Sequence, residues 1–257
     1  MKVLFIGDIF ARPGREMVAR TLPRIFETEK PDFVVANAEN AAGGKGLTPK
    51  TAYELFDTGV DVLTLGDHVW DRKEILEIID DKRILRPLNL PQGNPGRGRG
   101  LYTKGGNKLC VAVLMGRTFI ERPMDCPFAA AAKEVFDEPT LIDFHAEATS
   151  EKIAMKWFLA GRVSALLGTH THIATDDAVI EKGSAYITDC GMTGAYDSVI
   201  GVDKDIIIKR FLTGMTERFE PGRGDAQFHG VMVDIEGTKA VGIRKIRHPL
   251  FLTGRNL

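Results

Sequence analysis

Side chains able to bind metal recur along the 257-residue chain, each one just after a short apolar run. They are Asp8, Glu39 with Asn40, Asp67 with His68, His145, and His170 with His172. Carboxylate, amide and imidazole ligands without cysteine suit borderline divalent ions such as Fe, Mn, Zn or Ni. This number of candidates exceeds the roughly four ligands of one tetrahedral zinc, and it suits two ions that share a carboxylate. The pattern therefore predicts a site for two divalent metal ions.

Taken singly, most of these residues have an ordinary structural explanation. Asp8 could be a turn or capping residue, and Asp67 could cap a helix that follows it. Glu39 and Asn40 could belong to an ordinary loop. A lone histidine such as His145 is more often hydrogen-bonded within the structure than bound to metal. No single motif decides the question.

The histidine distribution favours the metal site. In an extended chain, His170 and His172 would point their rings to the same side. Four of the six histidines lie in the strand-end motifs. The other two, His229 and His248, lie outside them and are interpreted as structural.

Alternating strand and helix patterns in the first third of the chain predict a parallel sheet. The expected strands are residues 3–6, 33–36 and 60–65, and the expected helices are residues 14–29, 48–57 and 71–79. Such alternation implies right-handed crossovers, and open sheets of this kind place their ligands at the carboxyl ends of the strands. The polar motifs follow those ends.

The rest of the chain continues the α/β pattern and then changes to hairpins. We expect strands at 109–115, 140–144 and 163–167, helices at 128–135 and 150–161, and a loop at 86–100. Closely spaced strand-like runs at 177–180, 184–188, 231–234 and 240–246 indicate antiparallel hairpins. The sequence predicts an α/β fold in a single domain, residues 1–257.

Composition excludes several classes of protein. The chain is 44% hydrophobic and 27% charged, with a formal net charge of -1, which is typical of a globular protein and not of a nucleic-acid coat or membrane-surface protein. The three scattered cysteines, Cys110, Cys126 and Cys190, indicate free thiols in a reducing compartment. No apolar run reaches the length of a signal core or membrane span, so we expect a cytoplasmic protein without a membrane partner.

Two further features bear on nucleic acids and nucleotides. Arg97 and Arg99 are not interleaved with aromatic residues, so this segment is interpreted as a solvated loop and no stable nucleic-acid complex is expected. Trp70, just after the His68 motif, could stack on a base at the mouth of the site or could anchor the next helix in the core. The sequence leaves both alternatives open.

Seven segments together resemble the YmdB-like family of bacterial calcineurin-like metallophosphoesterases. They are GDIFARPGR (7–15), ANAENAAGGKGLT (36–48), LGDHVWD (65–71), LMGRTFIERPMDCPF (114–128), DFHAEATSEK (143–152), LGTHTHIATDD (167–177) and CGMTGAYDSVIGVDK (190–204). The resemblance covers almost the whole chain in order. It implies a four-layer α/β/β/α sandwich of two mixed sheets flanked by helices.

The resemblance also implies roles for the strand-end residues. One metal would be held by Asp8, Glu39, Asn40 and His172, and the other by Glu39, Asp67, His145 and His170, with Glu39 bridging. Iron or manganese are the usual metals. A hydroxide between the metals would attack a phosphodiester, with 2′,3′-cyclic nucleotides as the implied class, and His68 would donate a proton to the leaving oxygen. The family tends to self-associate, so a homo-oligomer is possible.

One residue departs from the family pattern. Where the family usually has Gly-Asn-His, this chain has Gly66-Asp67-His68. The added carboxylate leaves the site one charge less positive, which stabilises bound metals but weakens their pull on a phosphate and on a water proton. We therefore expect tighter metal binding and slower turnover than with Asn.

Two other functions remain open from the sequence. Because of Asp67, the chain could instead be a metal-containing regulatory or scaffold protein that senses a nucleotide with little turnover. The ligand types alone would also suit a dinuclear hydrolase of amides or lactones, and only the resemblance argues for phosphoesters.

Overall fold

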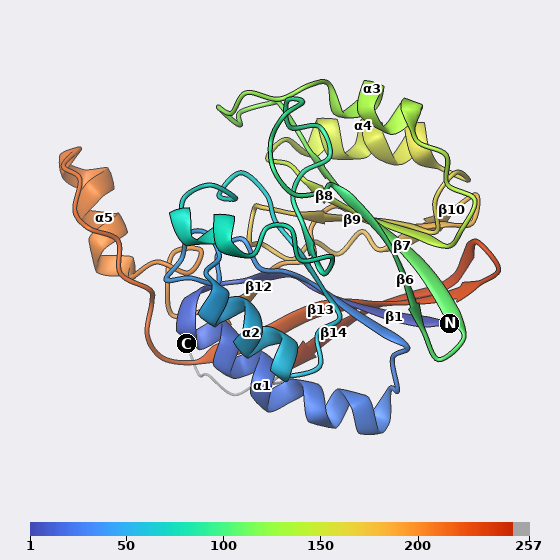
Figure 1. Cartoon of the computed structure of the whole chain (residues 1–257). Coiled ribbons are helices and arrows are strands. Elements are labelled where there is room, and N and C mark those ends of the chain that lie inside the picture. Colours follow the sequence, from blue (N-terminus) through green and yellow to red (C-terminus); the bar gives the residue numbers. More distant parts are fainter. Residues whose placement is uncertain (249–257) are drawn as a thin grey trace.

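Residues 1–248 of the computed structural model, the part that the structure describes, form two sheets packed face to face between helices (Figure 1). The first sheet has the order β2-β12-β13-β1-β3-β4-β5, with β14 paired to β13, and the second has the order β10-β11-β9-β8-β7-β6. The last part of the predicted domain, residues 249–257, lies outside the described residues.

The strands of the first sheet are β1 (Lys2–Ile6), β2 (Asp8–Ile9), β3 (Phe33–Asn37), β4 (Val62–Thr64), β5 (Ile84–Leu85), β12 (Met192–Ala195), β13 (Ala226–Glu236) and β14 (Lys239–His248). Those of the second are β6 (Arg99–Lys104), β7 (Asn107–Met115), β8 (Thr140–His145), β9 (Ala165–Thr169), β10 (Val179–Glu181) and β11 (Ser184–Ile187). The helices are α1 (Ala11–Thr28), α2 (Pro49–Asp57), α3 (Pro127–Lys133), α4 (Thr149–Leu159) and α5 (Lys204–Thr213), with a short 3-10 helix, η1 (Lys73–Glu77).

Three apolar layers hold these elements together. Side chains along each central strand point alternately to one layer and to the next. In β1, Leu4 and Ile6 pack under α1 and α2, whereas Val3 and Phe5 face the second sheet. Successive side chains of a strand point to opposite faces, so a fully apolar strand serves two layers. A third layer lies between the second sheet and the helices α3 and α4. The expected α/β/β/α sandwich is confirmed.

Several local predictions are also confirmed. The parallel pairs β1–β3, β3–β4, β7–β8 and β8–β9 form as expected, and β10–β11 and β13–β14 are antiparallel hairpins. Helix α2 begins as predicted, since the Thr48 side chain accepts a hydrogen bond from the Thr51 amide and Pro49 occupies the first turn. The three cysteines are free thiols, as expected.

The helix predicted at 71–79 is wrong. Only Lys73–Glu77 is helical, as a 3-10 turn that buries Ile75 and leaves Leu76 60% exposed. The helix predicted at 14–29 begins earlier, at Ala11, and contains Gly14 in its first turns. A Cβ at Gly14 would lie 2.3 Å from the Thr193 carbonyl oxygen, so this glycine lets α1 approach β12 closely.

Five elements were missed. Strands β2, β5 and β12 are short, and the predicted loop 86–100 gives way to β6 at Arg99. Helix α5 was also missed, although Asp203 caps its start and Gly214 ends it with a left-handed backbone at φ 71°. Figure 1 shows α5 projecting away from the two sheets.

Two further observations concern residues outside the site. None of the helices within residues 1–248 has the length and apolar character needed to cross a membrane. His229 is buried in β13, stacks on Tyr196 with ring centroids 5.0 Å apart, and lies 3.1 Å from the Gln227 side-chain oxygen. These contacts agree with its structural interpretation.

His229 should make the protein less stable in acid. Burial, with Arg247 and Lys245 nearby, lowers the pKa of His229 to about 4. The unfolded chain takes up this proton below about pH 6.5 and the folded chain only near pH 4, so stability is full above pH 6.5 and falls as the pH drops toward 4. Wild type should lose up to about 3 kcal/mol more than His229→Gln over that interval, measured by urea unfolding at several pH values. An identical pH dependence in both proteins would contradict this.

Candidate active site

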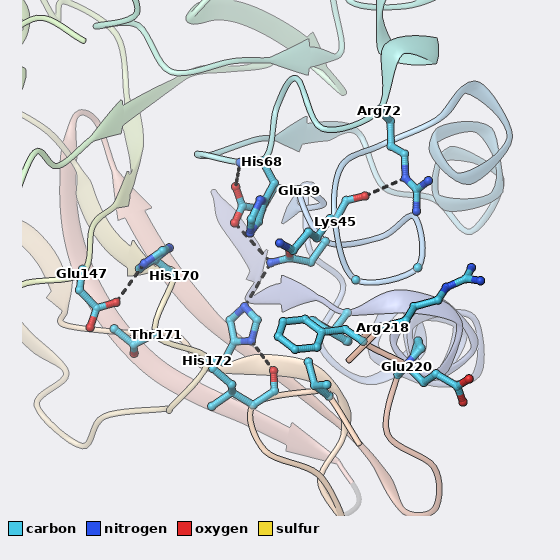
Figure 2. Close-up of a pocket in the computed structure, with 18 residues that line it drawn as sticks. Glu39, Lys45, His68, Arg72, Glu147, His170, Thr171, His172, Arg218 and Glu220 are labelled. Atoms are coloured by element: carbon cyan, nitrogen blue, oxygen red, sulfur yellow. Dashed lines mark hydrogen bonds and ion pairs between the residues drawn. The ribbon is translucent and has the colours of Figure 1, made fainter. Parts of the chain in front are cut away.

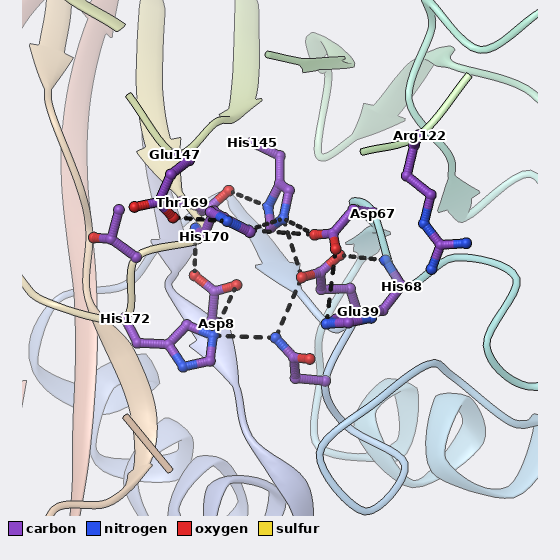
Figure 3. Close-up of polar contacts among 12 residues, drawn as sticks. Asp8, Glu39, Asp67, His68, Arg122, His145, Glu147, Thr169, His170 and His172 are labelled. Carbon is purple, nitrogen blue, oxygen red and sulfur yellow. Dashed lines mark hydrogen bonds and ion pairs between the residues drawn. The ribbon is translucent and has the colours of Figure 1, made fainter. Parts of the chain in front are cut away.

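The polar motifs meet at the carboxyl ends of strands from both sheets (Figure 3). The first sheet supplies the acidic side chains: Asp8 begins β2, Glu39 follows β3, and Asp67 follows β4. The second sheet supplies the imidazoles, because His145 ends β8, and His170 and His172 follow β9. The cluster therefore lies at the seam between the two sheets.

Four of these residues form a compact group. Glu39, Asp67, His145 and His170 each offer one ligand atom, and these atoms lie within 4.8 Å of one another. His145 Nε2 is 3.0 Å from both Glu39 Oε1 and Asp67 Oδ1, and His170 Nδ1 is 3.3 Å from Asp67 Oδ1. A group of this composition could hold a metal ion.

The remaining three predicted ligands adjoin this group through Glu39. Asn40 Nδ2 lies 3.3 Å from Glu39 Oε1 and 3.1 Å from His172 Nε2, and His172 Nε2 lies 3.7 Å from Asp8 Oδ1. Asp8 Oδ1 is buried and has no hydrogen-bond partner among the described residues. A buried carboxylate oxygen without a donor is costly unless a cation is placed beside it. The structure thus brings all seven predicted residues into one connected cluster.

Each of the three imidazoles is held through the nitrogen that faces away from the cluster. His145 Nδ1 lies 2.9 Å from the Thr169 hydroxyl, His170 Nε2 lies 3.0 Å from Glu147 Oε2, and His172 Nδ1 lies 2.9 Å from the Ile200 carbonyl oxygen. Thr169 itself donates to the Asp143 carboxylate at 2.6 Å, so its oxygen accepts the His145 Nδ1 proton. The opposite nitrogen of each ring then faces the carboxylates, where it can bind a metal ion once any proton on it is lost, which is the arrangement of metal-bound histidines.

The electrostatics of the cluster favour a cation. Burial raises the pKa of Asp8 above its ordinary value. Although burial opposes the shift, hydrogen bonds from His145 and His170 hold the pKa of Asp67 far below its usual range. Burial also opposes a charge on His145. The nearby carboxylates of Glu39 and Asp67 outweigh it and raise the pKa of His145 well above its usual value. A proton and a metal ion compete for the same lone pair.

The loop after β9 holds its two histidines in a left-handed backbone conformation. His170 and His172 have φ of 99° and 66°, so the extended geometry expected for this pair is wrong. Asp189 holds the intervening Thr171 by accepting from its amide at 3.1 Å and from its hydroxyl at 2.8 Å. Buried Lys152 donates to the same Asp189 oxygen at 2.8 Å. Strain of this kind persists only where surrounding contacts enforce it.

The space at the cluster also requires a glycine. A Cβ at Gly66 would lie 2.3 Å from Glu39 Oε2 and 2.3 Å from His145 Cδ2. No real Cβ contact is that short, so a side chain at position 66 would displace at least one of the two predicted ligands.

His68 lies beside the cluster, with 22% of its side chain exposed. Its Nδ1 is 2.8 Å from Asp71 Oδ2, and the other Asp71 oxygen accepts from Arg122 at 2.6 Å. The carboxylate therefore accepts a hydrogen bond from Nδ1 and fixes the ring, as in other carboxylate–histidine pairs. His68 Nε2 lies 3.8 Å from Asp67 Oδ2, on the cluster side.

A cavity of about 540 Å³ opens onto this cluster. Glu39, Asn40, His68, His170 and His172 form its polar side. Figure 2 shows Glu147 and His170 on one side of the cavity, with Lys45, Arg72 and Arg218 across from them. The cavity is large enough for a small organic molecule next to the cluster.

Several residues of the site were missed from the sequence. Glu147, Thr169, Asp143, Asp189 and Lys152 act behind the predicted ligands, as the contacts above show. Glu147 and Thr169 lie within two residues of a predicted ligand, which is a usable signal. Nothing local in the sequence marks Lys152, which lies on the helix α4.

The comparisons with known proteins agree with this geometry. The model of the YmdB-like protein family matches residues 4–246. A Bacillus subtilis protein named 2′,3′-cyclic-nucleotide 2′-phosphodiesterase is 46% identical over 255 residues, which cover 96% of each chain. Among solved structures, a hypothetical protein from Thermus thermophilus is 44% identical with a TM-score of 0.91, over 96% of this chain and 98% of that one. A phosphatase from Mycoplasma pneumoniae is 33% identical with a TM-score of 0.91, over 96% and 92%.

The fold and the cluster define a two-sheet α/β protein with side chains able to hold metal. The match over residues 4–246 and the 46% identity are specific to one family within that class. The chain belongs to the YmdB-like family.

Gly66→Ala should impair metal binding without unfolding the protein. The new methyl group would push Glu39 or His145 out of place, so we expect Mn²⁺ affinity to fall by at least about tenfold. Calorimetric titration with Mn²⁺ measures the affinity, and circular dichroism with thermal melting confirms that the variant is folded. A folded variant with wild-type affinity would show that these two side chains do not bind metal.

Proposed function

We propose that this chain is a metal-dependent phosphoester hydrolase that acts on phosphodiesters, with 2′,3′-cyclic nucleotides as its substrates. The observation that carries the proposal is the set of three imidazoles whose inner ring nitrogens converge on three carboxylates. The B. subtilis relative bears the name of such an enzyme, and the 46% identity extends along the whole chain.

The seven clustered residues would hold two divalent cations, with iron or manganese as the proposed metals. Asp8, Glu39, Asn40 and His172 would form one site, and Glu39, Asp67, His145 and His170 the other. Glu39 lies between the two groups, within 3.3 Å of Asn40 Nδ2 and 3.0 Å of His145 Nε2, which supports a shared carboxylate. A half-turn of the Asn40 amide would present its oxygen. Bound cations stabilise charge that develops on a phosphate and lower the pKa of water at the site.

His68 would donate the proton that the leaving oxygen needs. Asp71 accepts from Nδ1 and turns Nε2 toward the cluster, so that a doubly protonated His68 would present its Nε2 proton where a phosphodiester would lie. Arg122 holds Asp71 in place. In a 2′,3′-cyclic nucleotide, the leaving oxygen is a ribose hydroxyl, which is a poor leaving group without a proton donor.

The proposal is tested by incubating purified protein with 2′,3′-cyclic AMP after loading with Mn²⁺ and, in parallel, after treatment with a chelator. We expect a nucleoside monophosphate to form only in the metal-loaded sample, with activity restored when Mn²⁺ is returned. Binding of the nucleotide without any metal-dependent hydrolysis would instead indicate the regulatory or scaffold role.

His68→Ala should separate proton donation from metal binding. Loss of a positioned general acid lowers rates by roughly a hundredfold to ten-thousandfold. We expect kcat for 2′,3′-cyclic AMP to fall in that range, while elemental analysis shows an unchanged metal content. If the variant loses its metals, His68 is a ligand or a structural support, and the proposed role is wrong.

Asp67→Asn should raise turnover. The Asp67 carboxylate lies within the cluster, in contact with both His145 and His170. Replacing it with a neutral amide makes the cluster one charge more positive, which increases the attraction of the metals for phosphate and for a water oxygen. We expect a several-fold higher kcat and weaker retention of metal on dialysis. Unchanged or slower turnover at full metal content would contradict this account of the departure from the family's asparagine.

A further inference from the structure

The wall of the cavity contains apolar as well as polar side chains. Phe10, Ile200, Val202, Phe219 and Pro221 supply aromatic and aliphatic surface there. Phe219 and Pro221 belong to the segment that returns from α5 toward β13. If a cyclic phosphodiester were bound with its phosphate at the cluster, the rest of the molecule would therefore lie close to an apolar surface.

Of the two phenylalanines, only Phe219 has a ring available to a ligand. Phe10 is only 6% exposed, its ring lies edge-on to His172, and it is packed so tightly against Gly44 and Gly201 that a Cβ at either would come within 2.8 Å of the ring. Phe219 is half-buried, packs on the small apolar cluster around Phe10, and reaches the cavity. The flat surface offered by this wall is thus the Phe219 ring.

Positive charge surrounds this ring. Lys45 Nζ lies 5.9 Å and Arg210 Cζ lies 5.3 Å from the Phe219 ring centroid. Within residues 1–248, neither Lys45 nor Arg218 forms an ion pair with a carboxylate. The Lys45 ammonium is at the outer limit of a cation–π contact and sits on a flexible stem, so it can yield the ring face to a ligand.

We propose that Phe219 stacks on the base of the substrate and so selects nucleotides among cyclic phosphodiesters. This inference rests on the proposed function, because it assumes that the scissile phosphate lies at the cluster. Aromatic rings bind any base through its π-face, and Lys45 and Arg218 favour a ligand that is anionic as well as aromatic. Sugar phosphates and glycerol phosphodiesters have the charge but lack the ring.

Trp70, the other aromatic candidate from the sequence, is placed differently. It packs against the core of the first sheet and lines a separate cavity of about 230 Å³, which Asp67 also lines. Its position favours the anchoring role, and the base is assigned to Phe219.

The test compares two substrates on the Mn²⁺-loaded full-length protein: 2′,3′-cyclic AMP and ribose 2,3-cyclic phosphate, which lacks the base. In wild type, kcat/KM should favour the nucleotide. Phe219→Ala and Phe219→Leu should each lower this preference by about tenfold, mainly through KM for the nucleotide, and Phe219→Trp should retain it. Leucine keeps apolar packing but has no aromatic face.

Phe211→Ala is the matched control. Phe211 lies on α5, is 84% exposed and does not line the cavity, so its removal should leave the preference unchanged. The inference is overturned if Phe219→Leu keeps the wild-type preference, or if Phe219→Ala slows both substrates equally, since either result would mean that Phe219 only supports packing.

A binding measurement distinguishes failure of this inference from failure of the proposed function. Calorimetry with adenosine 3′-monophosphate requires no turnover, and Phe219→Ala should raise its Kd by about tenfold. If the wild type hydrolyses neither substrate but this difference in Kd is found, the proposed function fails and base stacking stands. Equal Kd values in both proteins reject base stacking.

Discussion

The site depends on placing three carboxylates and three imidazole nitrogens against one another in a buried position. Asp8 and Glu39 have almost no exposed side chain, and Asp67 only 15%. Carboxylate oxygens repel one another at such distances unless positive charge lies between them, and burial removes the water that would otherwise screen them. A proton on His145 or a metal cation can supply that charge, so the arrangement suits a cation-binding site.

The fold meets this requirement by drawing the two kinds of ligand from different sheets. The acidic residues follow strands of the first sheet and the histidines follow strands of the second, so face-to-face packing of the sheets brings the opposite sets together. The supporting contacts are buried as well: Lys152 and Asp189 fix the loop with the two histidines, and Asp143 fixes His145 through Thr169. The precision of the cluster comes from these residues behind it.

Much of the fold could be predicted because the central strands are fully apolar and end at turn residues, as residues 3–8 and 33–37 do. Short strands such as β12 gave no signal, since Met192–Ala195 has no alternation and pairs only through tertiary contacts. The seven predicted ligands lie together, but the reason given for His170 and His172 was wrong, because both have a left-handed backbone and Asp189, far along the sequence, holds Thr171 between them. Their coordination of metal stays a prediction.

The most direct measurement of the central claim is the metal content of the full-length protein after reconstitution with Mn²⁺ and removal of free metal, determined by elemental analysis. The account predicts close to two ions per chain in the wild type, and close to one when Asp8→Ala and His172→Ala together dismantle the group next to Glu39. A wild-type protein that retains no metal, or a double variant that still retains two ions, would contradict it.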